Sequence, residues 1–158
     1  MPSKATILVA ARDEEERIGP TIERLRSQFT GWPIVVGDDG SRDGTAPAAR
    51  AAGAVVVRGP RLGKGEALNA AERRAPAGPL LLCDADVEGD LRPLVETRWE
   101  LAIAAFGERI GGGLGLAKGT ARRLIRARTG FEAGEPLSGQ RFLTERARAA
   151  RFPRARGL

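Results

Sequence analysis

The stretch Leu80-Leu81-Leu82-Cys83-Asp84-Ala85-Asp86 places four apolar residues directly before two aspartates at alternate positions. A short run that is apolar at every position is typical of a strand buried on both faces, as in a parallel sheet. Parallel strands present the residues that follow them at one common edge, where ligands of α/β proteins bind. The stretch therefore predicts a buried parallel strand that ends at a pair of carboxylates.

Three further apolar runs precede this one, and segments with helical patterning alternate with them. The predicted strands are Ile7–Ala11, Ile34–Val36, Ala54–Val57 and Leu80–Cys83, and the predicted helices cover about 14–28, 47–52 and 66–74. Such alternation predicts a parallel sheet that is covered by helices on both faces. The predicted fold class is therefore α/β, with a Rossmann-like, doubly wound and mostly parallel sheet.

The later part of the chain carries a weaker pattern. Residues Leu101–Phe106 are predicted as a fifth strand and Leu116–Ala127 as a basic helix. Residues 141–158 are rich in Arg and Ala and show no convincing apolar face. We predict one domain, in which residues 1–106 form the main α/β half and residues 107–158 form a short basic segment.

The composition excludes several kinds of chemistry. The 158 residues, 42% of them apolar, suffice for one packed domain. The chain contains no His and no Tyr, which excludes His-dependent catalytic triads and His-ligated zinc. Its single cysteine, Cys83, permits no internal disulfide and suits a reducing cytoplasm, which is the predicted location. Any catalysis must use carboxylates, Lys, Arg, hydroxyls, backbone amides or a bound ion.

Charge is distributed unevenly along the chain. Residues 1–106 hold 14 basic and 16 acidic residues, a net charge of −2, whereas residues 107–158 hold 12 and 4, a net charge of +8. The basic part is either a solvated helix or a surface that attracts a phosphate, a nucleic acid or a membrane. With only 4% aromatic residues, the chain offers few platforms for stacking bases, so nucleic acid is not an expected partner.

Acidic residues follow three of the four predicted strands. They are Asp13 and Glu14, Asp38 and Asp39, and Asp84 and Asp86. Because the carboxyl ends of parallel strands meet at one edge, we expect these side chains to share one crevice. Asp84 and Asp86 are candidate ligands of Mg²⁺ or Mn²⁺, and the alternative is a turn-forming role. An ion there could neutralise charge on a departing diphosphate.

Two loops between these strands and helices are rich in glycine. Asp38–Thr45 has the composition of a tight turn with a helix start, and its carboxylates could also accept from a base or a ribose. Gly63-Lys64-Gly65 lacks the spacing and the Ser or Thr of a P-loop. Its glycines still allow close approach of the backbone, and Lys64 can contact a phosphate. A third glycine loop, 111–115, lacks the dinucleotide-binding spacing and is predicted as either a lid or a linker.

Taken in order, four motifs resemble the inverting GT-A glycosyltransferases of family 2. Their pattern runs Pro-x-x-Asn-Glu, Val-Asp-Asp-Gly-Ser-x-Asp-Gly-Thr, Gly-Lys-Gly-x-Ala-x-Asn and Asp-Ala-Asp. The corresponding segments here are Ala10–Glu14, Asp38–Thr45, Gly63–Asn69 and Asp84–Asp86. Further on, Pro136–Arg141 looks like the acceptor-side segment of some bacterial members. The chain is more distantly similar to polyprenyl-phosphate sugar transferases and glucosyl-3-phosphoglycerate synthases.

The resemblance implies a GT-A fold with a donor side in residues 1–106 and an acceptor side in residues 107–158. The residues implied in donor binding are Ala10, Arg12, Glu14, Asp39, Lys64 and Asp84. Among them, Glu14 and Asp39 would contact the nucleoside and Lys64 the diphosphate. Asp84 would contact the ribose or a metal-bound water, and Asp86 would ligate the metal directly.

The acceptor side implied by the resemblance consists of Ser138, Gly139, Gln140 and Arg141. The catalytic base is not identified, and Asp90 and Glu135 are candidates because they are carboxylates near the motifs. The implied function is transfer of a sugar from a nucleoside-diphosphate sugar, with UDP-sugars favoured, to an acceptor hydroxyl or phosphate. Mg²⁺ or Mn²⁺ would assist, and the alternative is a non-catalytic remnant that binds the nucleotide sugar.

The chain departs from the family pattern at two places. Ala10 stands where the family has Pro, and Asp13 stands where it has Asn. The chain also stops at Leu158 and has no His that could complete the metal site. The short acceptor half predicts that the isolated chain binds donor but transfers sugar slowly or not at all unless it dimerises. The expected dimer contact is the helix at 116–128, with Leu116, Leu124 and Ile125 as its apolar anchors. Besides a second copy of the chain, a membrane surface is a partner that the sequence suggests.

Overall fold

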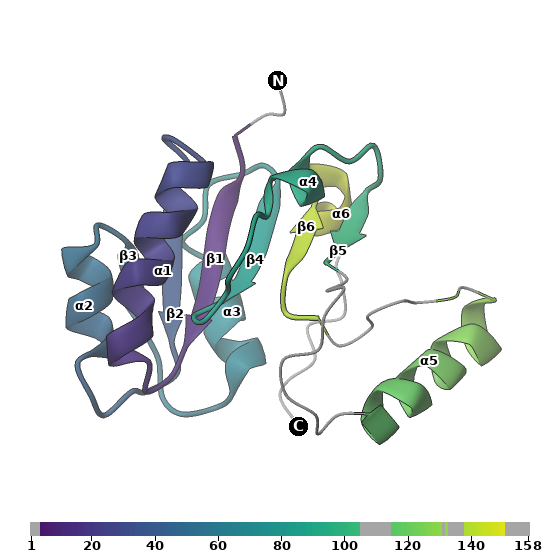
Figure 1. Ribbon diagram of the computed structural model, residues 1–158, viewed down its shortest axis with the longest axis horizontal. Helices are drawn as coiled ribbons and strands as arrows, with labels where there is room; N and C mark the ends of the chain where they lie inside the picture. The colour runs from purple at the N-terminus through teal and green to yellow at the C-terminus, as the bar shows by residue number, and fades with distance from the viewer. Residues whose placement is uncertain (1–3, 105–114, 131, 133–137, 151–158) are drawn as a thin grey trace.

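The fold is a six-stranded sheet with helices on both faces (Figure 1), seen in a computed structural model that describes residues 4–104, 115–130, 132 and 138–150. The strands are β1 (Thr6–Ala11), β2 (Ile34–Asp38), β3 (Val55–Arg58), β4 (Leu80–Asp84), β5 (Leu101–Ile103) and β6 (Arg141–Leu143). The helices are α1 (Glu15–Gln28), α2 (Thr45–Ala51), α3 (Lys64–Glu72), α4 (Arg92–Val95), α5 (Gly115–Thr129) and α6 (Glu145–Ala149).

The sheet is parallel over its first four strands and antiparallel at one edge. The strand order is β3-β2-β1-β4-β6-β5. β1 pairs in parallel with β2 and β4, and β2 pairs in parallel with β3. β6 runs antiparallel to both β4 and β5. The predicted α/β fold with a mostly parallel sheet is confirmed.

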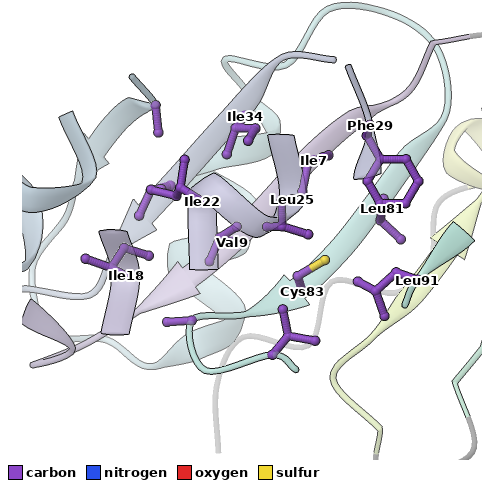
Figure 2. Close-up of a cluster of buried hydrophobic side chains, with 14 of the residues drawn as sticks. Ile7, Val9, Ile18, Ile22, Leu25, Phe29, Ile34, Leu81, Cys83 and Leu91 are labelled. Carbon is purple, nitrogen blue, oxygen red and sulfur yellow. The ribbon is translucent and has the colours of Figure 1, made fainter. Parts of the chain in front are cut away.

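The core has two parts because successive side chains of a strand point to opposite faces. Ile7 and Val9 pack with α1 in the larger cluster, which Figure 2 shows beside β1 and β4. Leu8 points to the other face, where it packs with Val35 of β2 and with Ala71 of α3. Figure 1 accordingly places α1 and α2 on one face of the sheet and α3 on the other.

Helix α1 covers the sheet through a regularly spaced apolar stripe. Ile18, Ile22 and Leu25 recur at intervals of four and three residues, and each is at most 1% exposed. Two acidic residues in the first turn, Glu15 and Glu16, oppose the positive end of the helix dipole. The helix therefore forms where the sequence pattern predicts it, and it carries its carboxylates to the carboxyl end of β1.

The fifth predicted strand is shorter than expected and lies elsewhere in the sheet. Only Leu101–Ile103 form β5, Ala104 lies outside it, and residues 105 and 106 lie outside the described part of the chain. β5 does not extend the parallel series, because β6 stands between it and β4. A three-residue strand is too short to reveal its direction through its own pattern.

The expectation that residues 141–158 lack an apolar face is wrong for the described residues up to 150. Phe142 and Leu143 of β6 are buried, as is Ala147 of α6. Arg148 holds α6 in place by donating to the carbonyl oxygens of Pro76 and Gly78, at 2.6 and 3.0 Å. A long arginine thus fixes this segment through hydrogen bonds, which an apolar pattern does not reveal.

The second half of the chain is part of the same sheet. β6, from residues 107–158, lies between two strands that belong to residues 1–106. The predicted helix at 116–127 is present as α5, and Figure 1 draws it apart from the sheet. The boundary at residue 106 stays a prediction, although the two parts share one sheet.

Candidate functional site

The register of the sheet brings the predicted carboxylates to one edge. Ala10 at the end of β1 pairs with Gly37 of β2 and with Asp84 of β4, and Ala11 pairs with Asp38. The turns after β1, β2 and β4 therefore leave the sheet side by side. The expected convergence of strand ends is a direct consequence of this parallel register.

Helix α3 reaches this edge because β2 carries a glycine where the helix crosses it. A Cβ on Gly37 would lie 2.2 Å from the carbonyl oxygen of Ala67 in α3, which no side chain tolerates. The absence of a side chain allows α3 to lie directly on β2. The helix begins at Lys64, so this close approach delivers the lysine to the carboxyl edge.

Asp38 has a structural role in the turn after β2. Its side chain is fully buried and accepts hydrogen bonds from the amide and the hydroxyl of Ser41. The Nε atom of Arg58 lies 3.3 Å from Asp38 Oδ2. Asp38 therefore has the turn-forming role, because its carboxylate is in contact with Ser41 and Arg58 of the protein itself.

Asp43 also serves the turn, at the start of α2. It accepts from the amide of Thr45 at 3.0 Å and from the Thr45 hydroxyl. These hydrogen bonds lower the pKa of Asp43 because they favour the charged carboxylate. The hydrogen bond from the Thr45 hydroxyl has the largest effect.

Asp39 ties the turn after β2 to the glycine loop that precedes α3. Its Oδ1 accepts from the amides of Leu62 and Gly63 at 2.8 and 2.9 Å, and its Oδ2 lies 3.5 Å from Nη1 of Arg12. The side chain is only 5% exposed. The structure thus shows that Asp39 sets the position of the residues just before Lys64, and its expected contact with a nucleoside stays a prediction.

The remaining residues of the expected donor side lie at the ends of β1 and α1. Ala10 is half-buried in β1, and the side chain of Arg12 is about half exposed. The amide of Glu14 donates to the Thr45 hydroxyl at 2.8 Å, and its carboxylate lies 3.4 Å from Arg17. The structure thus places all three at the same edge as Asp39.

Asp84 is at the centre of the site. Lys64 Nζ forms an ion pair with its Oδ1, and Gln140 Nε2 donates to its Oδ2 at 3.1 Å. A Cβ on Gly139 would lie 1.9 Å from Oδ2, so this glycine also lies against the carboxylate. The structure therefore brings together three predicted groups: the lysine loop, the Asp-x-Asp pair and the acceptor-side segment.

β6 explains why residues so distant in sequence meet at Asp84. Because β6 is antiparallel to β4, its first residue, Arg141, pairs with Leu82 near the carboxyl end of β4. The residues before β6 therefore lie beside those after β4. Ser138 stabilises this approach by accepting from the amide of Gln140 at 3.3 Å and, through its carbonyl, from Arg141 Nε at 2.9 Å.

Asp84 and Asp86 offer hard carboxylate oxygens, the kind of ligand that a divalent cation such as Mg²⁺ prefers. Asp86 is exposed and has no hydrogen-bond or ion-pair partner among the described residues, and Asp84 already faces the cationic Lys64. Within the described residues no three Asp, Glu, Cys or His side chains are grouped around one point, here or elsewhere, so the protein would supply at most two carboxylates to an ion at this site. One or two carboxylates completed by water and phosphate oxygens are a normal Mg²⁺ site.

The structure does not bring Asp90 to this site. Its neighbours Gly89 and Leu91 bond to Gln28 at the last turn of α1, at the opposite edge of the sheet. Asp90 accepts three hydrogen bonds from the Arg92 guanidinium, and these lower the pKa of Asp90, which makes it a weaker base. Glu135, the other candidate, lies outside the described residues.

The sequence predicts that Asp13 lies at this end of the sheet but not that it joins the loops there. It adopts a left-handed backbone conformation, with φ of 54°, and accepts from the Arg42 amide at 2.9 Å and from Arg61 Nη2 at 3.0 Å. It thereby joins the loops after β1, β2 and β3. The signal in the sequence is the residue type, since Asp and Asn tolerate this conformation better than most others.

Comparison with known sequences identifies a family over most of this region. The sequence profile described as Glycosyl transferase family 2 matches residues 6–97. The 4,4'-diaponeurosporenoate glycosyltransferase of Staphylococcus aureus is 36% identical over 98 residues. That alignment covers 58% of this chain and 26% of the S. aureus protein, so the chain spans about a quarter of this relative's length.

Solved structures agree with this assignment. Glucosyl-3-phosphoglycerate synthase from Mycobacterium tuberculosis in complex with UDP aligns with a TM-score of 0.73 and 25% identity, over 90% of this chain and 57% of that one. The same enzyme with Mn²⁺, UDP and glucosyl-3-phosphoglycerate gives a TM-score of 0.72 with the same identity and coverage. Mannosyl-3-phosphoglycerate synthase from Rubrobacter xylanophilus, 24% identical with a TM-score of 0.70 over 90% of this chain and 53% of its own, shares the fold.

Proposed function

The chain belongs to glycosyl transferase family 2, and from this premise we propose that it moves a sugar from a nucleoside-diphosphate sugar to an acceptor. The single observation that carries the proposal is the contact of Asp84 with both Lys64 and Gln140. One carboxylate thus joins a cation suited to a diphosphate and a segment expected to face the acceptor. A site for group transfer needs these two sides to meet.

The donor side of the proposal rests on the loops after β2 and β3. Asp39 is hydrogen-bonded to the backbone of Leu62 and Gly63, and these residues together form a continuous wall of the site next to Lys64. A nucleoside that lies along this wall directs its diphosphate to the lysine ammonium at the start of α3. Lys64 then exchanges its ion pair with Asp84 for a contact with phosphate oxygens, which carry more negative charge.

A divalent ion is the proposed cofactor, held by Asp86 and Asp84. When bound, Mg²⁺ or Mn²⁺ supplies charge neutralisation for the diphosphate leaving group. Asp86 is the stronger candidate ligand because it is exposed, whereas Asp84 is already in contact with Lys64 and Gln140. The solved structure of the M. tuberculosis synthase that contains Mn²⁺ and UDP supports the proposal for this chain.

The proposed reaction is a displacement at the anomeric carbon of the sugar. An acceptor oxygen forms the new bond, the bond to the diphosphate oxygen breaks, and the acceptor hydroxyl gives its proton to a base. Gln140 and Ser138 line the side of Asp84 from which the acceptor approaches. UDP-sugars are the proposed donors because the M. tuberculosis synthase has been solved with UDP and with UDP-glucose.

Calorimetric titration with UDP-, GDP- and dTDP-sugars, each with Mn²⁺ and with EDTA, tests donor binding. We expect one nucleotide to bind in preference, and more tightly with Mn²⁺. Asp84→Asn should remove most of this affinity, whereas Glu23→Gln, on the exposed side of α1, should leave it unchanged. No binding of any donor would contradict the proposal.

A transfer assay with the preferred donor then distinguishes the two functions. Release of nucleoside diphosphate that depends on an acceptor identifies a transferase. Tight binding without release over hours identifies the alternative, a domain that holds the nucleotide sugar and does not transfer it.

A further inference from the structure

We propose that helix α5 is a membrane-binding element that lies in the interface of an anionic lipid surface. This inference is independent of the proposed transferase activity, because it uses none of the residues around Asp84. It rests on the charge of the helix, on the arrangement of its apolar residues and on its exposure.

The charge of α5 has one sign only. Its 15 residues, Gly115–Thr129, include five basic residues and no acidic one: Lys118, Arg122, Arg123, Arg126 and Arg128. Arg126 lies 3.3 Å from Glu132 beyond the helix end, but both side chains are more than 70% exposed, so the pair screens little of this charge. A helix of this composition is attracted to a surface of negative charge.

The apolar residues of α5 share one half of the helix. At 100° per residue, Ala121, Leu124 and Ile125 fall within one half of the circumference, while Arg122 and Arg126 fall in the other. Arg128 lies on the apolar half but in the last turn, where its long side chain can extend to the surface. Basic amphipathic helices of this kind lie parallel to a membrane, with the apolar half among the acyl chains.

The apolar half is exposed at Leu124 and half-exposed at Ala121 and Ile125. Leu124 is 58% exposed. Across the described residues, α5 packs extensively against no other helix or strand, and Figure 1 shows it apart from the sheet. With a length of about 22 Å, α5 cannot span a bilayer, and none of the described helices is long and apolar enough to do so.

An anionic membrane fits this surface better than the other partners do. A second copy of α5 would bring ten basic side chains together with no acidic partner on either helix, so the dimer expected through Leu124 and Ile125 is opposed by charge. A nucleic acid would satisfy the arginines but would leave the apolar half in water, and α5 has no aromatic residue to stack on a base. In an anionic membrane, the acyl chains contact the apolar half of α5 and the headgroups contact its basic residues.

Sedimentation of the full chain with vesicles tests the proposal. We expect binding to vesicles of 30% phosphatidylglycerol in phosphatidylcholine, little binding to pure phosphatidylcholine, and loss of binding in high salt. Each arginine near an anionic surface strengthens binding about fivefold, so the triple variant R123Q/R126Q/R128Q should bind about 100-fold more weakly. The control R50Q/R73Q/R74Q removes the same charge from exposed positions on α2 and after α3 and should bind as the original chain does.

The orientation of the helix provides a second readout. Cys83 is 1% exposed, so a thiol-reactive dye labels an added surface cysteine selectively. A polarity-sensitive dye on Leu124→Cys should shift to the blue with anionic vesicles, and the same dye on Arg126→Cys should not. Equal losses in the two triple variants, equal shifts of the two dyes, or binding to RNA in preference to vesicles would overturn the proposal. A dimer in light scattering that Leu124→Gln dissociates, without vesicle binding, would also overturn it.

Discussion

Gln140 donates its side-chain amide to Asp84 across the antiparallel pair of β4 and β6, with 3.1 Å between Nε2 and Oδ2. The two residues are 56 positions apart in sequence. The contact joins the segment expected to face an acceptor to the carboxylate expected to serve the donor. The position of the Asp84 carboxylate is therefore sensitive to substitutions on the donor side and in the acceptor-side segment.

Gly139→Ala should reduce donor binding without unfolding the protein. The new Cβ would lie 1.9 Å from Oδ2 of Asp84, and the carboxylate can turn away because it is the free end of a side chain. We expect donor affinity to fall at least tenfold in calorimetry, with a small change in Tm. Gly19→Ala in α1 is the control, since its Cβ meets no atom within 4 Å, and it should leave donor affinity unchanged.

Lys64→Ala should weaken the binding of UDP by at least tenfold, about 1.4 kcal/mol, and the binding of uridine by less than twofold. The difference arises because the ammonium contacts the diphosphate and not the nucleoside. Titration of both ligands into each variant measures it. Arg73→Ala, at the other end of α3, is the matched loss of an exposed positive charge and should affect neither ligand. Equal losses for UDP and uridine would mean that Lys64 acts through the fold.

Asp86→Ala should remove the contribution of the metal to donor binding. Loss of one carboxylate ligand is expected to cost at least about 1.4 kcal/mol, which is tenfold in affinity. UDP should then bind equally well in Mn²⁺ and in EDTA. Glu88→Ala removes an exposed carboxylate two residues further along and should preserve the difference. A Mn²⁺ dependence that survives in Asp86→Ala would place the ion elsewhere.

Asp39→Ala should release the loop that leads to Lys64. It leaves the amides of Leu62 and Gly63 without their acceptor, at a cost of about 1–3 kcal/mol for each amide that stays unsatisfied. Amide exchange measured by NMR should become faster at these two positions, and donor affinity should fall as well. Asp39→Asn keeps one acceptor oxygen and should retain most of the protection, so equal exchange in both variants would contradict this role.

The stability of the protein should fall in alkaline solution through Cys83. Burial raises the pKa of this thiol above its ordinary value of 9.0, because the thiolate is disfavoured inside the core. The folded state keeps the proton that the unfolded state loses, so the free energy of unfolding declines as the pH rises above about 9. The slope approaches about 1.4 kcal/mol per pH unit for one proton. Urea denaturation of Cys83→Ala should lack this component of the slope.

The parallel half of the sheet could be predicted because its strands carry their signal locally. Ile7–Ala11 and Leu80–Cys83 are apolar at almost every position and are followed by turn-forming or acidic residues. Such runs identify a strand that is buried on both faces without any knowledge of its neighbours. That Asp39 and Asp84 lie at the same end of the sheet follows from the parallel arrangement alone.

The antiparallel edge could not be predicted in the same way. β6 consists of Arg141, Phe142 and Leu143, too few residues for a periodic pattern, and its first residue is charged. Its place beside β4 depends on contacts made across the fold, such as those of Arg148 with the loop before β4. The interaction between Gln140 and Asp84 therefore had no local signal, although both residues were singled out separately.

The insertion of β6 beside β4 has a consequence for synthesis on the ribosome. β4 is complete at Asp84, but the strand that covers its free edge ends only at Leu143. At 5–20 residues per second, that edge waits roughly 3–12 s for its partner. An uncovered parallel strand during that interval is a template for pairing with other chains. The nascent protein is thus most exposed to aggregation after its four parallel strands have emerged, and chaperones that bind extended apolar segments would act on it during this interval.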